Sequence, residues 1–182
     1  MKFKISLLII TILSLSAIPF ISGCDNPRHQ KPENYPDALM QMPNATAVKY
    51  YEYGGTLQMT YKILVDYPAS EVIETIYNHL KKNNWRVMKE DFLNPGETAP
   101  AQNWSFFEDV STKPTQTIHQ QISYWENDAG EVLAYWFFYK YESGKTKDLK
   151  NLTVTGVFYS APLAKKTREE ALEWHKNNPV KN

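Results

Sequence analysis

The pattern of apolar and polar residues along the chain begins with a predicted β-hairpin. Residues 47–53 and 56–65 are rich in β-branched and aromatic side chains and flank Gly54 and Gly55, a combination typical of two strands joined by a tight turn. In the second strand apolar and polar residues alternate. We therefore expect one of its faces to lie in a core and the other to be largely solvated.

Helical spacing follows the hairpin, from Pro68 to about Lys82. Proline suits the first turn of a helix, and the apolar residues of this segment recur every three or four positions. Further strands are expected at 85–89, 104–110, 115–126, 131–142 and 152–160, and a last helix from Thr167, capped through Glu170. This order predicts an α+β fold, in which one helix packs on a face of an antiparallel β-sheet and a second helix is C-terminal.

The pairing of strands 115–126 and 131–142 is predicted from the turn between them. The sequence Asn-Asp-Ala-Gly at 127–130 suits a type I turn with Gly130 in the left-handed conformation. In this register Ile122 and Tyr124 share a face with Ala134 and Trp136, which we expect to form the core. The opposite face collects six candidate binding residues, namely His119, Gln121, Trp125, Tyr135, Tyr139 and Tyr141.

That second face has two interpretations. Aromatic side chains with polar ends are typical of surfaces that dock a partner protein or an amphipathic ligand. The alternative is a central strand whose two faces are both covered by neighbouring side chains. A two-residue turn would shift the pairing by one and change which side chains meet.

The N-terminus has the order of a secretory signal. Lys2 and Lys4 are followed by a mainly apolar stretch up to Phe20, and small residues precede Cys24. The sequence Ile21-Ser22-Gly23-Cys24 resembles the lipobox of bacterial prolipoproteins, which consists of an aliphatic residue, a spacer, Gly or Ala, and Cys.

The resemblance implies lipidation of Cys24. Its thiol would receive a diacylglyceryl group, a dedicated peptidase would cut between Gly23 and Cys24, and the new α-amine would carry a further acyl chain such as palmitate. Two or more chains give lasting attachment to a membrane. The alternative is an uncleaved membrane span, but the apolar stretch is interrupted by polar residues and is shorter than the roughly 20 residues that a span needs.

The residue after Cys24 indicates in which membrane we expect the lipoprotein to be anchored. An Asp at this position, here Asp25, resembles the signal that retains lipoproteins in the inner membrane of enteric bacteria. We therefore expect the bacterial cell envelope, on the periplasmic side of the inner membrane, with the outer membrane as the alternative.

Residues 24–46 are interpreted as the lipidated Cys24 followed by a flexible tether. This segment contains four prolines among mostly polar residues and shows no periodicity. Its reach would be about 25 Å as a coil and about 55 Å if stiffened by proline. A single globular domain is expected over residues 47–182, after the signal peptide of residues 1–23.

The composition and the absence of known motifs exclude several classes of function. Removal of residues 1–23 would leave 159 residues with 18 basic and 20 acidic side chains, a net charge of −2, which argues against a nucleic-acid partner. The single Cys excludes a disulfide within the chain. No G-x-S-x-G motif or phosphate-binding glycine-rich loop is present. Three of the four His residues lack a second ligand at helical spacing, and between His29 and Glu33, four residues on, a proline interrupts a segment with no helical pattern. We expect no cofactor and no metal.

These patterns indicate a lipid-anchored envelope protein whose domain binds or scaffolds another envelope component without catalysis. The alternative is a small envelope hydrolase or ligand carrier. Its pocket would lie between the helix that begins near Pro68, the 90–103 loop and the strand that carries His119.

Overall fold

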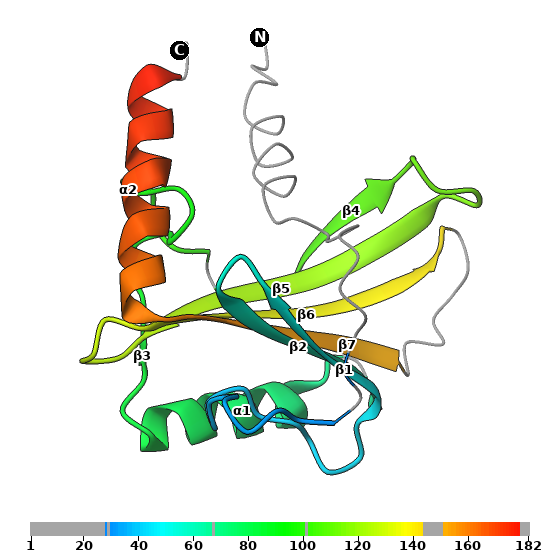
Figure 1. Ribbon diagram of the computed structural model, residues 1–182. Helices are drawn as coiled ribbons and strands as arrows, with labels where there is room; N and C mark the ends of the chain where they lie inside the picture. The colour runs from blue at the N-terminus through cyan, green and yellow to red at the C-terminus, as the bar shows by residue number, and fades with distance from the viewer. Residues whose placement is uncertain (1–27, 29, 67, 101, 144–150, 179–182) are drawn as a thin grey trace, which may run out of the picture.

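The computed structural model describes residues 28, 30–66, 68–100, 102–143 and 151–178 (Figure 1). The predicted signal peptide, the predicted lipobox with Gly23 and Cys24, and Asp25 lie outside these residues. Among the described residues, no helix is long and apolar enough to cross a membrane. The elements are β1 (Thr46–Tyr53), β2 (Thr56–Leu64), α1 (Ser70–Lys82), β3 (Arg86–Val87), β4 (Ser105–Asp109), β5 (Gln116–Glu126), β6 (Val132–Glu142), β7 (Asn151–Tyr159) and α2 (Ala161–Asn177).

The strands form one antiparallel sheet in the order β1-β2-β7-β6-β5-β3, and β4 pairs with another part of β5. Figure 1 shows α1 on one side of this sheet and α2 rising from the other. The predicted α+β architecture, with an antiparallel sheet, a helix on one face and a C-terminal helix, is confirmed.

The larger core lies between α1 and the sheet. The apolar stripe of α1 is buried as its spacing predicted, and it packs against alternate residues of β2, β5, β6 and β7. In β2 the alternation is confirmed, because Leu57, Met59, Tyr61 and Ile63 are buried whereas Lys62 is exposed. A smaller core on the opposite face joins Trp136 and Val157 of the sheet to Phe92 and to Ala164 of α2.

The predicted register of β5 and β6 is also confirmed. Tyr124 pairs with Ala134, and Gly130 has a φ of 78°. Oδ1 of Asn127 accepts hydrogen bonds from the backbone N–H groups of Ala129 and Glu131 at 3.0 and 3.1 Å. These bonds stabilise the turn. A local turn with its own hydrogen bonds can be predicted from a short stretch of sequence.

The expected boundary of the domain at residue 47 needs correction. Residues 30–45 pack on the α1 side of the sheet, where Tyr35, Ala38 and Leu39 are buried. The hydroxyl of Tyr135 donates to the Ala38 carbonyl at 2.7 Å and accepts the Met40 N–H at 2.9 Å. The described part of the predicted tether is therefore folded, because scattered apolar and tyrosine contacts hold a segment that has no periodicity of its own.

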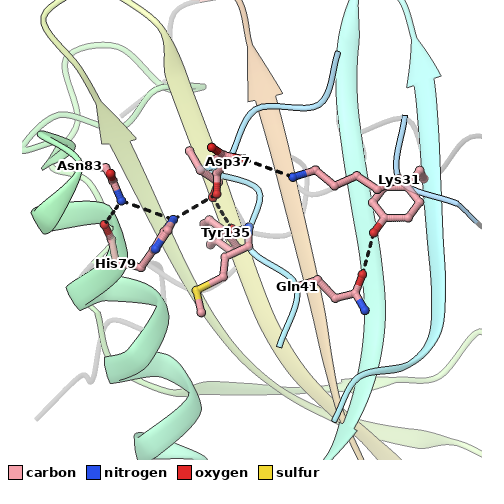
Figure 2. A network of polar contacts seen from close by, with 9 residues as sticks. Lys31, Asp37, Gln41, His79, Asn83 and Tyr135 are labelled. Carbon is pink, nitrogen blue, oxygen red and sulfur yellow. Dashed lines mark hydrogen bonds and ion pairs between the residues drawn. The ribbon is translucent and has the colours of Figure 1, made fainter. Parts of the chain in front are cut away.

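Polar contacts tie the same segment to its neighbours (Figure 2). A ring nitrogen of His79, on α1, lies 3.1 Å from the Asp37 carbonyl oxygen, and the Tyr50 hydroxyl donates to the Gln41 side chain at 2.7 Å. The segment thus bridges α1 and the β1 edge of the sheet.

The start of the C-terminal helix also differs from the prediction. The helix α2 begins at Ala161 instead of Thr167, directly after β7, with Pro162 in its first turn. Thr167 therefore lies inside the helix and does not cap it. Proline is favoured in a first turn because its missing N–H would have no partner within the helix there.

Candidate binding site at the β4 edge

The six candidate residues share one face of the β5–β6 pair, but most of that face is core. His119 pairs with Tyr139 and Gln121 with Phe137, as the predicted register requires. However, the exposed fractions of Gln121, Trp125, Tyr135 and Tyr139 are only 5%, 0%, 0% and 1%. The expectation that this face is open to a partner is therefore corrected for these four residues.

The physical reason is the position of α1. Tyr77 of this helix packs on Trp125 and Phe137, with ring centroids 5.0 and 5.9 Å apart. Gln121 donates from its amide nitrogen to the Tyr77 hydroxyl at 3.1 Å, and burial raises the pKa of Tyr77. Trp125 and Gln121 thus have their ring contacts and hydrogen bond within the protein, where they stabilise the packing of α1 on the sheet.

His119 and Tyr141 lie further along the same face, towards β4. Both are half-buried, and the Tyr141 hydroxyl is hydrogen-bonded to Nε2 of His119 at 3.0 Å. Phe106 of β4 pairs across from His119, with ring centroids 5.8 Å apart, and is 75% exposed. Trp104, just before β4, packs on Tyr139 at 5.5 Å. We call Trp104, Phe106, His119 and Tyr141 the His119 patch.

A carboxylate borders this patch. Glu108 accepts hydrogen bonds from the hydroxyls of Thr117, at 2.7 Å, and Ser143. The Ser143 hydroxyl and then the Thr117 hydroxyl lower the pKa of Glu108, because both donate to its charged form. The border of the patch is therefore anionic at neutral pH.

The side chains of the patch have the chemistry that a docking surface uses. The patch combines aromatic area, an imidazole–phenol pair and an ionised carboxylate, which together provide apolar burial and directional hydrogen bonds. No group of three or more metal-ligating side chains occurs within the described part of the chain.

The pocket expected for a hydrolase or carrier would need the 90–103 loop beside the strand that carries His119. Met88 and Phe92 pack in the smaller core, on the face of the sheet opposite His119. The neighbouring Glu90 pairs with Arg168 of α2 and not with α1. The described start of the 90–103 loop therefore lies across the sheet from the strand face that carries His119.

Sequence reasoning missed Phe106 and Trp104 as members of the site. Residues 104–110 were expected to form a strand, and β4 confirms that a strand lies there. Alternation within this short strand carries no information about its partner, so only the pairing of β4 with β5 places Phe106 beside His119.

Comparison with known proteins adds no family to this description. No protein-family model matches the chain, and no curated protein is significantly similar to it.

Proposed function

We propose that this protein is a lipid-anchored envelope lipoprotein whose folded domain binds another envelope protein through the His119 patch, without catalysing a reaction. The lipobox supports the anchor, and Asp25 supports the periplasmic side of the inner membrane. The observation that carries the binding role is Phe106, a large apolar side chain that is 75% exposed beside the hydrogen-bonded pair of His119 and Tyr141.

The position of Phe106 on β4 suits recognition. Burying a Phe side chain fully contributes roughly 1.5–3 kcal/mol, and central aromatic residues dominate the energetics of many interfaces. Among the described residues, β4 pairs with β5 alone. Its other edge can therefore add an extended segment of a partner, with backbone hydrogen bonds giving affinity and Phe106 giving specificity.

Site-specific photo-crosslinking in intact cells tests this proposal. The photoreactive residue replaces Phe106 in the full chain, and a matched control replaces Leu64, which is also apolar and is 68% exposed on β2. We expect a discrete protein adduct from position 106 and none from position 64. Tyr135 and Tyr139 are unsuited to the probe because both are buried.

A second variant separates docking from chance proximity. His119→Ala removes a ring that faces Phe106 and should weaken the adduct formed at position 106. Membrane fractionation confirms that the variant is still anchored. Equal adducts at positions 106 and 64, or an adduct at 106 that is insensitive to His119→Ala, would contradict the proposal.

A further inference from the structure

The carboxylate that borders the His119 patch is held in one orientation. Glu108 is exposed on β4, and each of its oxygens accepts one hydroxyl: Oε1 that of Thr117, at 2.7 Å, and Oε2 that of Ser143. The two hydroxyl oxygens also lie 3.1 Å from each other. A carboxylate that is already oriented loses little conformational freedom when it binds a further donor, and each oxygen has a second lone pair to offer.

This carboxylate has no cationic partner within the described part of the chain. Hydrogen bonds, and not a nearby lysine or arginine, lower the pKa of Glu108. The pKa of the next residue, Asp109, is lowered first by the Ser111 hydroxyl and in part by Lys140. Because side chains alternate along a strand, Asp109 lies on the opposite face of β4. Glu108 is therefore the charge that a docked partner meets beside the patch.

An aromatic ring lies next to this charge. Phe106 and Glu108 are two residues apart on β4, so their side chains share the face on which His119 and Thr117 pair with them. In a strand added at the outer edge of β4, the residue directly opposite Glu108 would have its Cβ about 5 Å away and would lie diagonally across from Phe106. A lysine or arginine there can reach both, and a carboxylate and an aromatic ring each attract a cation.

The charges of β4 argue against a second copy of this chain as the added strand. Between Ser105 and Asp109 the strand has two carboxylates and no basic residue. Two copies paired at this edge would bring four carboxylates together, and like charges across a strand pair are destabilising. The same carboxylates favour a segment with a basic side chain, so they select one class of partner against another.

We propose that the partner segment which docks on β4 is an extended stretch of another protein, with a lysine or arginine that binds Glu108 and packs on the ring of Phe106. This inference rests on the proposed function and adds the chemistry of the partner to it. Phe106 provides apolar burial, and Glu108 decides which segments fit.

Glu108→Gln tests the charge in the crosslinking experiment at position 106, with the full chain in intact cells. A benzoylphenylalanine probe keeps an aromatic ring at that position. Gln has nearly the shape of Glu without its charge, so we expect the adduct to fall about fivefold, as for loss of a well-oriented exposed ion pair. Asp109→Asn is the matched control, because it removes the neighbouring carboxylate on the other face, and it should leave the adduct unchanged. Circular dichroism of each purified variant shows whether the fold is kept.

The position of the crosslink in the partner gives a second measurement that needs no change at position 108. Mass spectrometry of the adduct should place a lysine or arginine within two residues of the crosslinked position. Glu108→Lys should then abolish the adduct, and replacement of that basic residue by Glu in the partner should restore it. Restoration depends on the two charges and would not follow from a general loss of folding.

The outcomes separate this inference from the function on which it rests. If position 106 gives no adduct in the otherwise unsubstituted chain, the proposed function is overturned and this inference with it. An adduct that resists Glu108→Gln, a crosslinked segment without a basic residue, or a charge exchange that does not restore the adduct would overturn the basic partner alone. An adduct with a second copy of the chain would overturn it as well.

Discussion

At the scale of single residues, Tyr135 and Gly156 together hold residues 30–45 against the sheet. Tyr135 is fully buried and bonds the backbone at Ala38 and Met40. Gly156 pairs with Tyr135 across β6 and β7, and a Cβ atom there would lie 2.8 Å from Cδ2 of Leu39 and 3.1 Å from Cε1 of Tyr135. The missing side chain makes the room that Leu39 occupies.

Tyr135→Phe should lower the free energy of unfolding by about 1–3 kcal/mol, because the Ala38 carbonyl and the Met40 N–H lose their partner in a buried site. Urea denaturation of the soluble domain measures the change. Tyr53→Phe is the matched control, since Tyr53 is 41% exposed, and it should leave stability unchanged. Similar values for the two variants would show that the Tyr135 hydrogen bonds contribute little.

Gly156→Ala should also destabilise the fold, by about 1–3 kcal/mol, because the new methyl group overpacks the site of Leu39. A double-mutant cycle with Leu39→Ala tests the cause. Removal of the Leu39 side chain should relieve the clash, so the double variant should lose less stability than the sum of the single variants. Additive losses would place the cost of Gly156→Ala elsewhere.

At the scale of elements, residues 30–45 act as part of the domain. They have no regular strand or helix, yet the single Tyr35 O–H lies within hydrogen-bond reach of the Tyr51 and Gln58 carbonyls, and Leu39 is 1% exposed. The segment therefore completes the core beside Tyr135 and Tyr61.

Deletion of residues 25–45 tests this assignment. A soluble chain that begins at Thr46 should lose cooperative unfolding or aggregate, because apolar surface covered by Tyr35, Ala38 and Leu39 becomes exposed. Thermal unfolding followed by circular dichroism compares it with a chain that begins at Asp25. A tether would be dispensable, so equal midpoints for the two chains would restore the original boundary at residue 47.

At the scale of the whole molecule, the core contains several buried tyrosines whose hydroxyls are neutral up to high pH. Burial raises the pKa of Tyr35 and of Tyr159 from 10.0 to about 12 in each case, and it raises those of Tyr61, Tyr124 and Tyr135 as well. The unfolded chain ionises near the ordinary tyrosine pKa, whereas the folded chain resists ionisation.

The protein should therefore unfold in alkali. Because the folded-state pKa values are raised, their stabilising contribution is fully present below about pH 10 and is lost as the pH rises towards 12. Denaturant titrations across this range, with tyrosinate absorbance as a second signal, measure the loss. Tyr159→Phe should reduce the pH dependence, and a free energy of unfolding that stays constant across the range would contradict the expectation.

The sequence by itself determined the features that depend on local geometry. Periodicity located α1 and the alternating faces of β2, and the residues of the 127–130 turn set the register that places His119 opposite Tyr139. It could therefore group the candidate residues on one face. It did not place Trp104 and Phe106 with them, because pairing between β4 and β5 is a non-local contact.

The tertiary structure alone decided which face is covered. Residues 132–139 of β6 are apolar on both sides, so alternation could not show whether α1 packs on Tyr135 or on Trp136. That choice depends on how distant elements fit together, and α1 and residues 30–45 cover the Tyr135 side. Residues 30–45, which we expected to form a tether, are part of this core because Gly156 has no side chain in the space that Leu39 occupies. His119 and Tyr141 lie at the border of the covered region, where they are half-buried.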